Sequence, residues 1–340
     1  MSATIKDIAR CTGLSIATIS KYINGGNVLE KNRTVIEQAI SELNYSVNEA
    51  ARNLKTKHTG YVGLLLPALT NQFMMAMVNN IQAVMRAEGW GVSLCCLHSG
   101  RPEERKAEEK EAIQFLMRKG IDGLINMPMN EDGSHLTEVI KAGIPVTLVD
   151  KHITELSGQV NSVVIDNVGA CRQLTDELLN AGHRNIIAVF SERNSYTSAR
   201  RYEGYVDACR QRGFEPDPKY TIFTDCHGET DTFQHIADLV QGGATAILTA
   251  AESQLREVLK TLKAQRITVP DQVSIASFDG GADSIYNDIT AAVQPKQELS
   301  TLAAQIMCQN LRAIAEDRLF PTQLCTLNAS IYVADSIRQI

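Results

Sequence analysis

Two patterns of hydrophobic positions divide the chain near residue 60. Residues 1–58 carry apolar side chains at helical spacing in short runs, separated by polar and glycine-containing turns. From Tyr61 onward, short apolar runs alternate with helical segments of roughly a dozen or more residues. Runs that are apolar on both faces and spaced by helices are typical of parallel strands covered on both sides. The expected strands are 62–67, 92–97, 122–128, 145–150, 162–166, 185–190, 246–250 and 273–278.

The first segment carries the pattern of a helix-turn-helix. Ile8 on one short helix and Ile19 on the next are placed to pack together, and Gly13 between them suits a tight turn. Ser15 is a good N-cap for the second helix, which ends at Gly25-Gly26. Two short helices joined in this way form a unit whose second helix enters the major groove of DNA.

The segment also resembles the headpiece of the lactose/galactose repressor (LacI/GalR) family. That family's pattern is T-hydrophobic-x-D-hydrophobic-A, then a Gly-hydrophobic-S turn, then A-T-hydrophobic-S-R and an N-G ending. Lys21 replaces the more usual Arg, and Ile16 and Ala17 occupy positions that vary between members with different operators. The residues that match as they stand are Thr4, Asp7, Ala9, Gly13, Leu14, Ser15, Thr18, Ser20, Asn24 and Gly25.

The resemblance continues past the second helix and implies a contact with double-stranded operator DNA. It covers a third helix at about 32–44 and a short helix at 48–54, which is too short to be stable alone. In the family this hinge helix folds on DNA, pairs with its mate in a homodimer and wedges a Leu, here Leu54, into the minor groove. The alternative is a linker helix with Leu54 packed on the core. The residues expected at the DNA are Thr4, Lys6, Ser15, Ile16, Ala17, Thr18, Ser20, Lys21, Asn24, Arg52, Leu54 and Lys55.

Charge is distributed in the same way. Within 1–58, eight basic residues outnumber five acidic ones and leave a net charge of +3. Because the whole chain has a net charge of −6, the remaining residues carry a net charge of −9. Affinity for a polyanion is therefore expected only in the N-terminal segment, and the acidic remainder favours solubility.

The remainder, 60–340, is expected to form an effector-binding and dimerisation core. Its strands are too numerous for one comfortable sheet, so an N-terminal all-α helix-turn-helix headpiece should precede an α/β core of two lobes. The resemblance implies that the core is periplasmic-binding-protein-like, with two doubly wound parallel-sheet lobes. Lobe 1 would comprise about 60–160 and 291–322, and lobe 2 about 163–290 and 323–340.

Ligands of such folds bind at the carboxyl ends of strands, in the cleft between the lobes. Asn71 and Phe73 match a family loop usually written N-P-F. Arg201 matches R-x-x-G-[FY], whose Arg usually forks onto ligand oxygens, and Thr197 lies just upstream of it. Asp279 matches the Asp of V-S-x-x-G-[FY]-D and would accept ligand hydroxyls. These five residues are the expected effector site.

Each of these matches also has a structural alternative. Phe73 could lie in the core, Arg201 could form a surface ion pair with Glu203, and Asp279 could cap the following turn. An Asp166-Asn167 pair at the expected lobe crossing matches the family as well, and it could equally be structural.

The resemblance implies a sugar-like effector. The family often has N-D after the strand at 246–250, where this chain reads Ala-Ala-Glu-Ser with Glu252 in third place. An Arg fork without the N-D pair favours a sugar acid or sugar phosphate over a neutral sugar. The family favours an inducer, and a corepressor remains open.

A repressor of carbohydrate-metabolism genes is the expected function, and a sensor-enzyme with a DNA-binding appendage is the alternative. The chain has no G-x-G-x-x-G after a strand, no G-x-S-x-G and no P-loop, so we expect neither catalytic residues nor a cofactor. Its eight cysteines lack metal spacing, and no apolar run reaches the roughly 18 residues of a membrane span. We therefore expect a cytoplasmic protein without a metal or a membrane partner. The charged run 103–111 predicts a solvated helix face.

Overall fold

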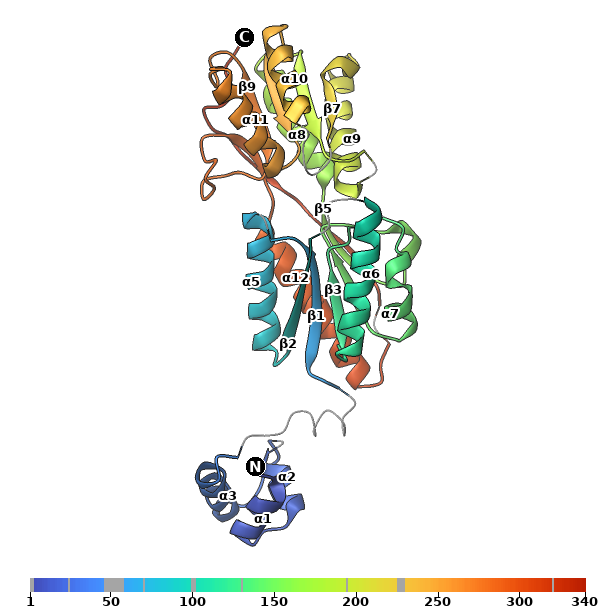
Figure 1. Ribbon diagram of the computed structural model, residues 1–340, viewed down its shortest axis with the longest axis vertical. Coiled ribbons are helices and arrows are strands. Elements are labelled where there is room, and N and C mark those ends of the chain that lie inside the picture. Colours follow the sequence, from blue (N-terminus) through green and yellow to red (C-terminus); the bar gives the residue numbers. More distant parts are fainter. Residues whose placement is uncertain are drawn as a thin grey trace. The chain divides into compact units, whose positions relative to one another are not determined.

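This computed structural model divides the chain into two compact units, Met1–Thr59 and Gly60–Ile340. The first is an all-helical headpiece and the second is an α/β core (Figure 1). No helix in the described part is long and apolar enough to cross a membrane. Asn24 and the expected hinge helix 48–54, with Arg52, Leu54 and the adjacent Lys55, lie outside the described residues. The described residues are 3–23, 25–45, 58–69, 71–98, 102–129, 131–193, 195–224, 230–319 and 321–340.

The described part of the headpiece has three helices around a small apolar core. These helices are α1 (Ile5–Thr12), α2 (Ile16–Ile23) and α3 (Glu30–Glu42). Ile8, Ile19 and Ile36, one from each helix, are fully buried in a single cluster. Because each helix buries only one narrow stripe, the opposite faces of α1 and α2 stay available at the surface.

Among the described residues, the core has two six-stranded sheets of closely similar design. The first has the order β11-β5-β4-β3-β1-β2, and the second has the order β12-β10-β9-β8-β6-β7. The neighbouring strands pair in parallel except β12, which pairs antiparallel with β10. The first sheet comprises β1 (Tyr61–Pro67), β2 (Gly91–Leu97), β3 (Gly123–Asn126), β4 (Val146–Val149), β5 (Asn161–Ile165) and β11 (Leu324–Leu327). The second comprises β6 (Ile186–Phe190), β7 (Thr221–Phe223), β8 (Ala246–Thr249), β9 (Ser274–Phe278), β10 (Thr290–Val293) and β12 (Ser330–Tyr332).

Helices cover both faces of each sheet, which explains the uninterrupted apolar runs of the central strands. In the first lobe, α5 and α12 lie on one side of the sheet and α6 and α7 on the other (Figure 1). That lobe has α5 (Gln72–Ala87), α6 (Pro102–Arg118), α7 (Thr137–Lys141) and α12 (Lys296–Ala315). The second lobe has α8 (Asn167–Asn180), α9 (Tyr196–Gln211), α10 (Thr230–Gln241) and α11 (Glu252–Ala264).

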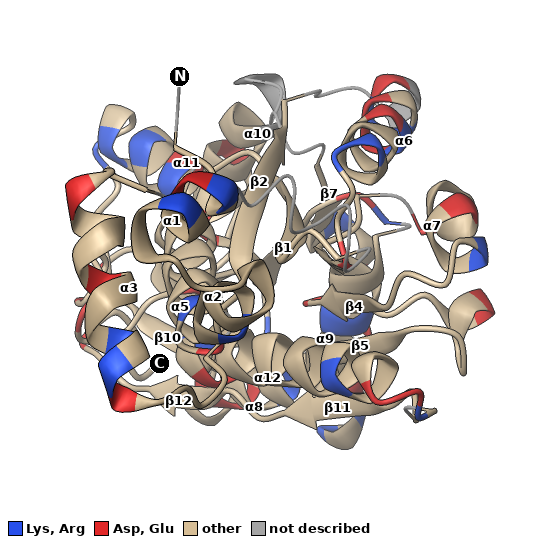
Figure 2. Cartoon of the chain, turned by 90° about the horizontal axis from the view of Figure 1, so that it is seen from below, with Lys and Arg blue, Asp and Glu red and all other residues tan. Residues whose placement is uncertain are grey.

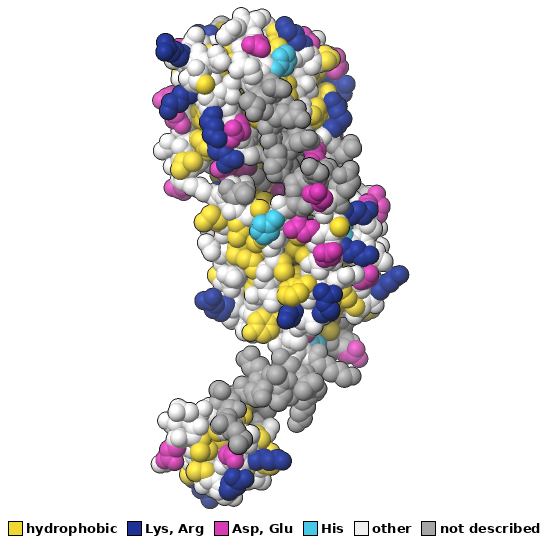
Figure 3. All heavy atoms as spheres, in the orientation of Figure 1, with side chains coloured by type: hydrophobic (Ala, Val, Ile, Leu, Met, Phe, Trp, Pro, Cys, Tyr) yellow, Lys and Arg dark blue, Asp and Glu magenta, His cyan; other side chains and the backbone are white. Residues whose placement is uncertain are grey.

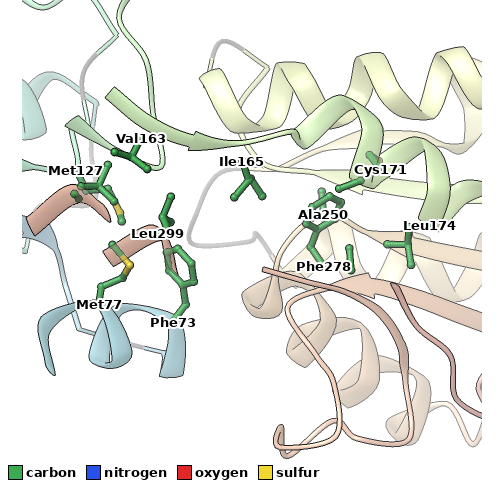
Figure 4. Close-up of a cluster of buried hydrophobic side chains, with 14 of the residues drawn as sticks. Phe73, Met77, Met127, Val163, Ile165, Cys171, Leu174, Ala250, Phe278 and Leu299 are labelled. Atoms are coloured by element: carbon green, nitrogen blue, oxygen red, sulfur yellow. The ribbon is translucent and has the colours of Figure 1, made fainter. Parts of the chain in front are cut away.

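One hydrophobic cluster extends through both lobes. Figure 4 shows Phe73, Met77 and Leu299 on the side of the first lobe and Phe278 on the side of the second, with Ile165 between them. Met74 and Met77 of α5 also pack in this cluster. The lobes therefore share a continuous apolar interior where the chain passes from one to the other.

The chain crosses between the lobes after Ile165, after Val293 and after Leu327. All three crossings come a few residues later than the sequence suggested. The strand at 161–165 stays in the first sheet to its end, and β10 joins the second sheet before the chain returns to the first lobe. The short β11 also belongs to the first sheet, because it pairs with β5, although 323–340 was assigned to the second lobe. Its alternately exposed residues give no continuous apolar run, so the hydrophobic pattern could not reveal it.

Candidate DNA interface and effector cleft

The first candidate site is the outward face of α2. Packing of Ile19 against the headpiece core turns the opposite side of this helix to the surface. Ile16 is 45% exposed despite its apolar side chain, and Ala17 and Lys21 are also exposed. Part of the Ile16 side chain is therefore available for contact with another molecule.

The local geometry of α1 and α2 comes from their first turns. The Asp7 carboxylate accepts hydrogen bonds from the Thr4 amide at 2.9 Å and from the Thr4 hydroxyl at 2.7 Å. These bonds, with the Thr4 hydroxyl foremost, hold the pKa of Asp7 below its usual value. In α2 the Ser15 hydroxyl accepts from the Thr18 amide at 3.2 Å, which satisfies one of the free N–H groups of that helix start.

The remaining expected DNA contacts in the described part of the headpiece are not buried. Lys6 on α1 is exposed, and Ser20 is half-buried. Figure 2 shows Lys and Arg in blue on the headpiece helices, which carry Lys6, Arg10, Lys21, Lys31 and Arg33. A groove beside α2 is lined by Ala17, Thr18 and Lys21 together with residues that the sequence did not single out, namely Asn27, Val28, Leu29 and Asn32.

The second candidate site lies where strands of both lobes end. Asp150 follows β4 and Asp279 follows β9, and these two strands occupy the same place in the order of their sheets. Both residues have a left-handed backbone, with φ of 65° and 62°. Such a conformation is uncommon for residues other than glycine, although Asp tolerates it better than most. The two lobes therefore present a carboxylate in the same local geometry from opposite sides.

Asp150 was not recognised in the sequence, where it reads as the last residue of a buried strand. Burial raises the pKa of its carboxyl to about 6, against the opposing effect of the positive charges of Arg201 and Lys151. The Asp279 carboxylate adds to the rise, so charges of the second lobe act on the Asp150 carboxyl of the first. No described residue donates a hydrogen bond to the buried Oδ1 of Asp150.

Arg201 is a buried residue of the second lobe, with 6% of its surface exposed. Its Nε donates to Asn167 Oδ1 at 2.7 Å, its Nη1 donates to the Ala250 carbonyl, and its guanidinium lies 3.9 Å from the centre of the Phe278 ring. The expected alternative of a pair with Glu203 does not apply, because Arg200 makes that ion pair at 2.8 Å.

The sequence motif around Arg201 explains this placement. A Cβ at Gly204 would come within 2.2 Å of the Val168 carbonyl, so only glycine lets α9 pack this closely against α8. Asn167 is the first residue of α8, and Asp166 caps that helix by accepting from the Gly169 amide at 2.8 Å. The Asp166-Asn167 pair thus has a structural role, and Asn167 additionally orients Arg201.

The other expected effector residues lie at different depths. Asn71 caps α5, with its side-chain oxygen accepting from the Met74 amide at 2.9 Å. Phe73 is only 5% exposed and packs in the hydrophobic cluster, as its structural alternative supposed. Thr197 is half-buried in the first turn of α9, and Asp279 accepts from Gln294 Nε2 at 2.6 Å.

The segment after β8 has its own hydrogen-bond network. This is the segment that departs from the family pattern. Gln254 accepts from the Ala250 amide at 3.0 Å and donates to Ser191 Oγ at 3.2 Å. Glu252 begins α11, and burial followed by the nearby Asp279 charge raises the pKa of its carboxyl. This end of the second lobe therefore carries two neighbouring carboxylates.

Helix α6 presents the solvated face that its charged run predicted at Glu104, Lys106, Lys110 and Glu111, which are exposed, but two charged residues of the run turn inward. Arg105 is 7% exposed, and Glu109 is fully buried. Glu109 accepts from the Asn126 side chain at 3.3 Å and from the Met129 amide at 3.1 Å. The alternating charges did not reveal that Arg105 and Glu109 lie on the buried face of this helix.

Two family profiles match this chain in succession. The profile described as bacterial regulatory proteins of the lacI family matches residues 4–48. The profile described as periplasmic binding proteins and sugar binding domain of the LacI family matches residues 59–321, most of the core. The chain belongs to the LacI family. It is a DNA-binding transcriptional regulator with a sugar-binding core, and members of the family are repressors rather than enzymes.

Full-length relatives of the LacI family agree with this assignment. The regulator EndR of Paenibacillus polymyxa is 27% identical over 350 residues, covering 100% of both chains. The structure of the lac repressor dimer bound to operator and an anti-inducer has a TM-score of 0.82 at 19% identity, covering 99% of this chain and 100% of that one. A complex of the regulator CelR with cellobiose has a TM-score of 0.72 at 22% identity, covering 98% and 99%. The lac repressor is a dimer on its operator in the first of these structures. DNA-binding transcription regulators of this family act in the cytosol.

Proposed function

We propose that α2 reads base edges of the operator and that the surrounding polar residues of the headpiece contact the phosphate backbone. Ile16 and Ala17 are exposed but cannot form paired hydrogen bonds to a base, so they suit contact with thymine methyl groups. Lys21 can reach guanine or phosphate. The proposed supporting contacts are Thr4, Lys6, Ser15, Thr18, Ser20 and Asn24, with Arg52, Leu54 and Lys55 in the minor groove.

We further propose that the cleft binds an uncharged, polyhydroxylated effector through Asp150, Arg201 and Asp279, with Asn71 and Thr197 as further polar contacts. The observation that supports this proposal is the set of interactions that Arg201 already makes within the protein. Two of its nitrogens already donate to groups of its own lobe, and its positive charge already acts on the Asp150 carboxylate.

A sugar acid or sugar phosphate, which the sequence favoured, would place a third negative charge in this cleft. Like charges about 4 Å apart repel by roughly 4 kcal/mol at the effective dielectric constant of partly buried sites. Sugar hydroxyls instead donate to carboxylates, and Asp150 Oδ1 lacks a donor among the described residues. The complex of CelR with cellobiose, a neutral disaccharide, shows that the fold accepts such a ligand.

Binding between the lobes supplies the regulatory mechanism. Asp150 belongs to the first lobe, while Arg201 and Asp279 belong to the second. A ligand that contacts all three is bound tightly only in one relative arrangement of the lobes, so it shifts the population toward that arrangement. The resulting movement of the first lobe changes the affinity of the dimer for its operator.

The test is a calorimetric comparison of sugars that differ only in charge. Neutral monosaccharides and disaccharides are measured beside their uronate, phosphate and amino counterparts. We expect the tightest ligand to be neutral and to bind at least about tenfold more strongly than its acidic counterpart, a difference of about 1.4 kcal/mol. A sugar acid or phosphate that binds more tightly than its neutral parent would refute the proposed ligand class.

Two variants locate the binding site. Asp279→Asn keeps the size of the side chain but loses a charged acceptor, so it should weaken the neutral ligand. Arg200→Ala is the matched control, because Arg200 neighbours Arg201 on the same helix but is paired with the exposed Glu203. Equal weakening by both variants would remove the support for the cleft assignment.

A further inference from the structure

Two polar bridges join the lobes beside the cleft. Arg105 Nη2, in the first turns of α6, donates to Glu192 Oε1 in the loop after β6 at 2.5 Å. Glu131 Oε1, in the loop after β3, accepts from the Tyr196 amide at 3.1 Å and pairs with Lys151 at 3.0 Å. Arg105 and Glu131 belong to the first lobe, and Glu192 and Tyr196 belong to the second.

The Arg105–Glu192 pair lies away from the edge at which the chain crosses between the lobes. The crossing strands β5 and β11 form one end of the first sheet, whereas β2, which leads into α6, forms the other end. In the second sheet, β10 and β12 form the crossing end, and β6 lies beside the opposite edge strand β7. Figure 1 shows α6 reaching the second lobe beside α9. Rotation of the lobes about the crossings would therefore separate Arg105 from Glu192 before it separates groups that lie near the crossings.

The pair is strong only in the arrangement of the lobes seen here. The Arg105 side chain is 8% exposed and the Glu192 side chain is 28% exposed, so water screens their attraction weakly. When a largely desolvated partner is removed, the remaining charge is left without compensation. Opening of the lobes would relieve that cost by returning the remaining charged group to water.

We propose that Arg105 and Glu192 form a latch that holds the two lobes together in the ligand-free protein. The latch sets the fraction of molecules whose cleft is closed, and this fraction scales the apparent affinity for any ligand that binds the closed form. Arg105 and Glu192 are thus positioning residues that need not touch the effector. Only this consequence for effector affinity rests on the proposed cleft; the latch itself can be measured without a ligand.

The Tyr196 amide offers a built-in measurement of closure. As the first residue of α9 it has no acceptor within its own helix, and it donates across the cleft to Glu131. Hydrogen–deuterium exchange of the full-length protein, read on peptides that contain the start of α9, reports opening of the lobes. We expect Arg105→Glu and Glu192→Arg each to raise exchange there by about tenfold or more, which corresponds to a loss of about 1.4 kcal/mol.

The combined charge swap decides between a latch and a merely structural role. In the double variant Arg105→Glu/Glu192→Arg the opposite charges face each other again, so exchange should return toward the parental rate. A packing role of Arg105 within the first lobe could not be rescued by a change in the second. The latch is refuted if the single variants exchange like the parent or if the swap exchanges as fast as the single variants.

Lys106→Glu is the matched control. It makes the same charge change one residue further along α6, but Lys106 pairs with Asp132 inside the first lobe. It should leave exchange at Tyr196 unchanged, and acceleration equal to that in Arg105→Glu would contradict the latch. If a charge reversal prevents folding, as judged by circular dichroism, Glu192→Gln replaces it, because this partly exposed loop residue tolerates a neutral side chain of equal size.

Discussion

Replacement of Asp150 by Asn should stabilise the protein at neutral pH. In the folded chain the pKa of this carboxyl rises from 3.8 to about 6, mainly because of burial. Folding therefore disfavours the ionised form of Asp150. The loss of unfolding free energy is absent below pH 3.8, grows as the pH rises toward 6, and is complete above that value.

The size of the effect follows from the same values. Each tenfold change in acid dissociation corresponds to about 1.4 kcal/mol, so a rise from 3.8 to about 6 makes the ionised carboxylate cost about 3 kcal/mol. Asn carries no charge to desolvate and tolerates the left-handed backbone at this position. We expect Asp150→Asn to be more stable than the parent by about 2–3 kcal/mol at pH 7.5, and by about 1 kcal/mol or less at pH 4.5.

Urea unfolding of the full-length protein, followed by circular dichroism between pH 4.5 and pH 7.5, measures this difference. The informative quantity is the change of the difference with pH, because general effects of the substitution on packing do not titrate. An advantage of equal size at both pH values, or a variant that is less stable than the parent at pH 7.5, would refute the reasoning. A residue whose removal stabilises the fold is retained for function, so the variant should also lose effector binding.

Further predictions address the headpiece, the hinge and the dimer. Leu54→Ala should weaken operator binding at least about tenfold in gel-shift titrations while effector binding stays intact, because the minor-groove wedge is lost; unchanged operator affinity would exclude the wedge. Ile19→Ala should destabilise the headpiece by about 2–5 kcal/mol and abolish operator binding, with the core still binding its ligand in calorimetry. Substitution of Ala17 should change the half-site recovered by binding-site selection, and an unaltered preference would show that α2 does not read bases there. Hydrophobic side chains gather on the face of the first lobe shown in Figure 3, and Met75 on α5 is 54% exposed; Met75→Asp should lower dimer affinity in sedimentation, whereas Phe115→Asp on α6 should not.

Most of the fold could be predicted from patterns that are local in sequence. The apolar spacing of Ile8 and Ile19 identified the packed pair of the headpiece, and the uninterrupted apolar runs identified the central strands, because each depends on neighbours in sequence. The strands β7, β10 and β11 were missed. The first and last of these lie at the edge of a sheet, where a strand needs no continuous apolar run.

The candidate cleft could be predicted only in part, because its chemistry depends on contacts between distant residues. Arg201 was identified from its motif, but its engagement with Asn167 and Ala250 depends on the packing of α8, α9 and the end of β8. Asp150 carries no local signal, and it becomes notable only when the second lobe brings Arg201 and Asp279 near it. Arg105 and Glu192 are 87 residues apart, so no spacing rule could pair them.

The interleaving of the two lobes limits how this protein can be divided and recombined. After Val293 the chain still has to supply α12 and β11 to the first lobe and β12 to the second. No single cut inside the core therefore releases an intact lobe, and the parts that recognise the effector must be inherited together. The headpiece has its own apolar core and joins the rest by one stretch of chain. Recombination at that junction would join a headpiece of different operator specificity to an unchanged effector-binding core. The two specificities can therefore diversify independently.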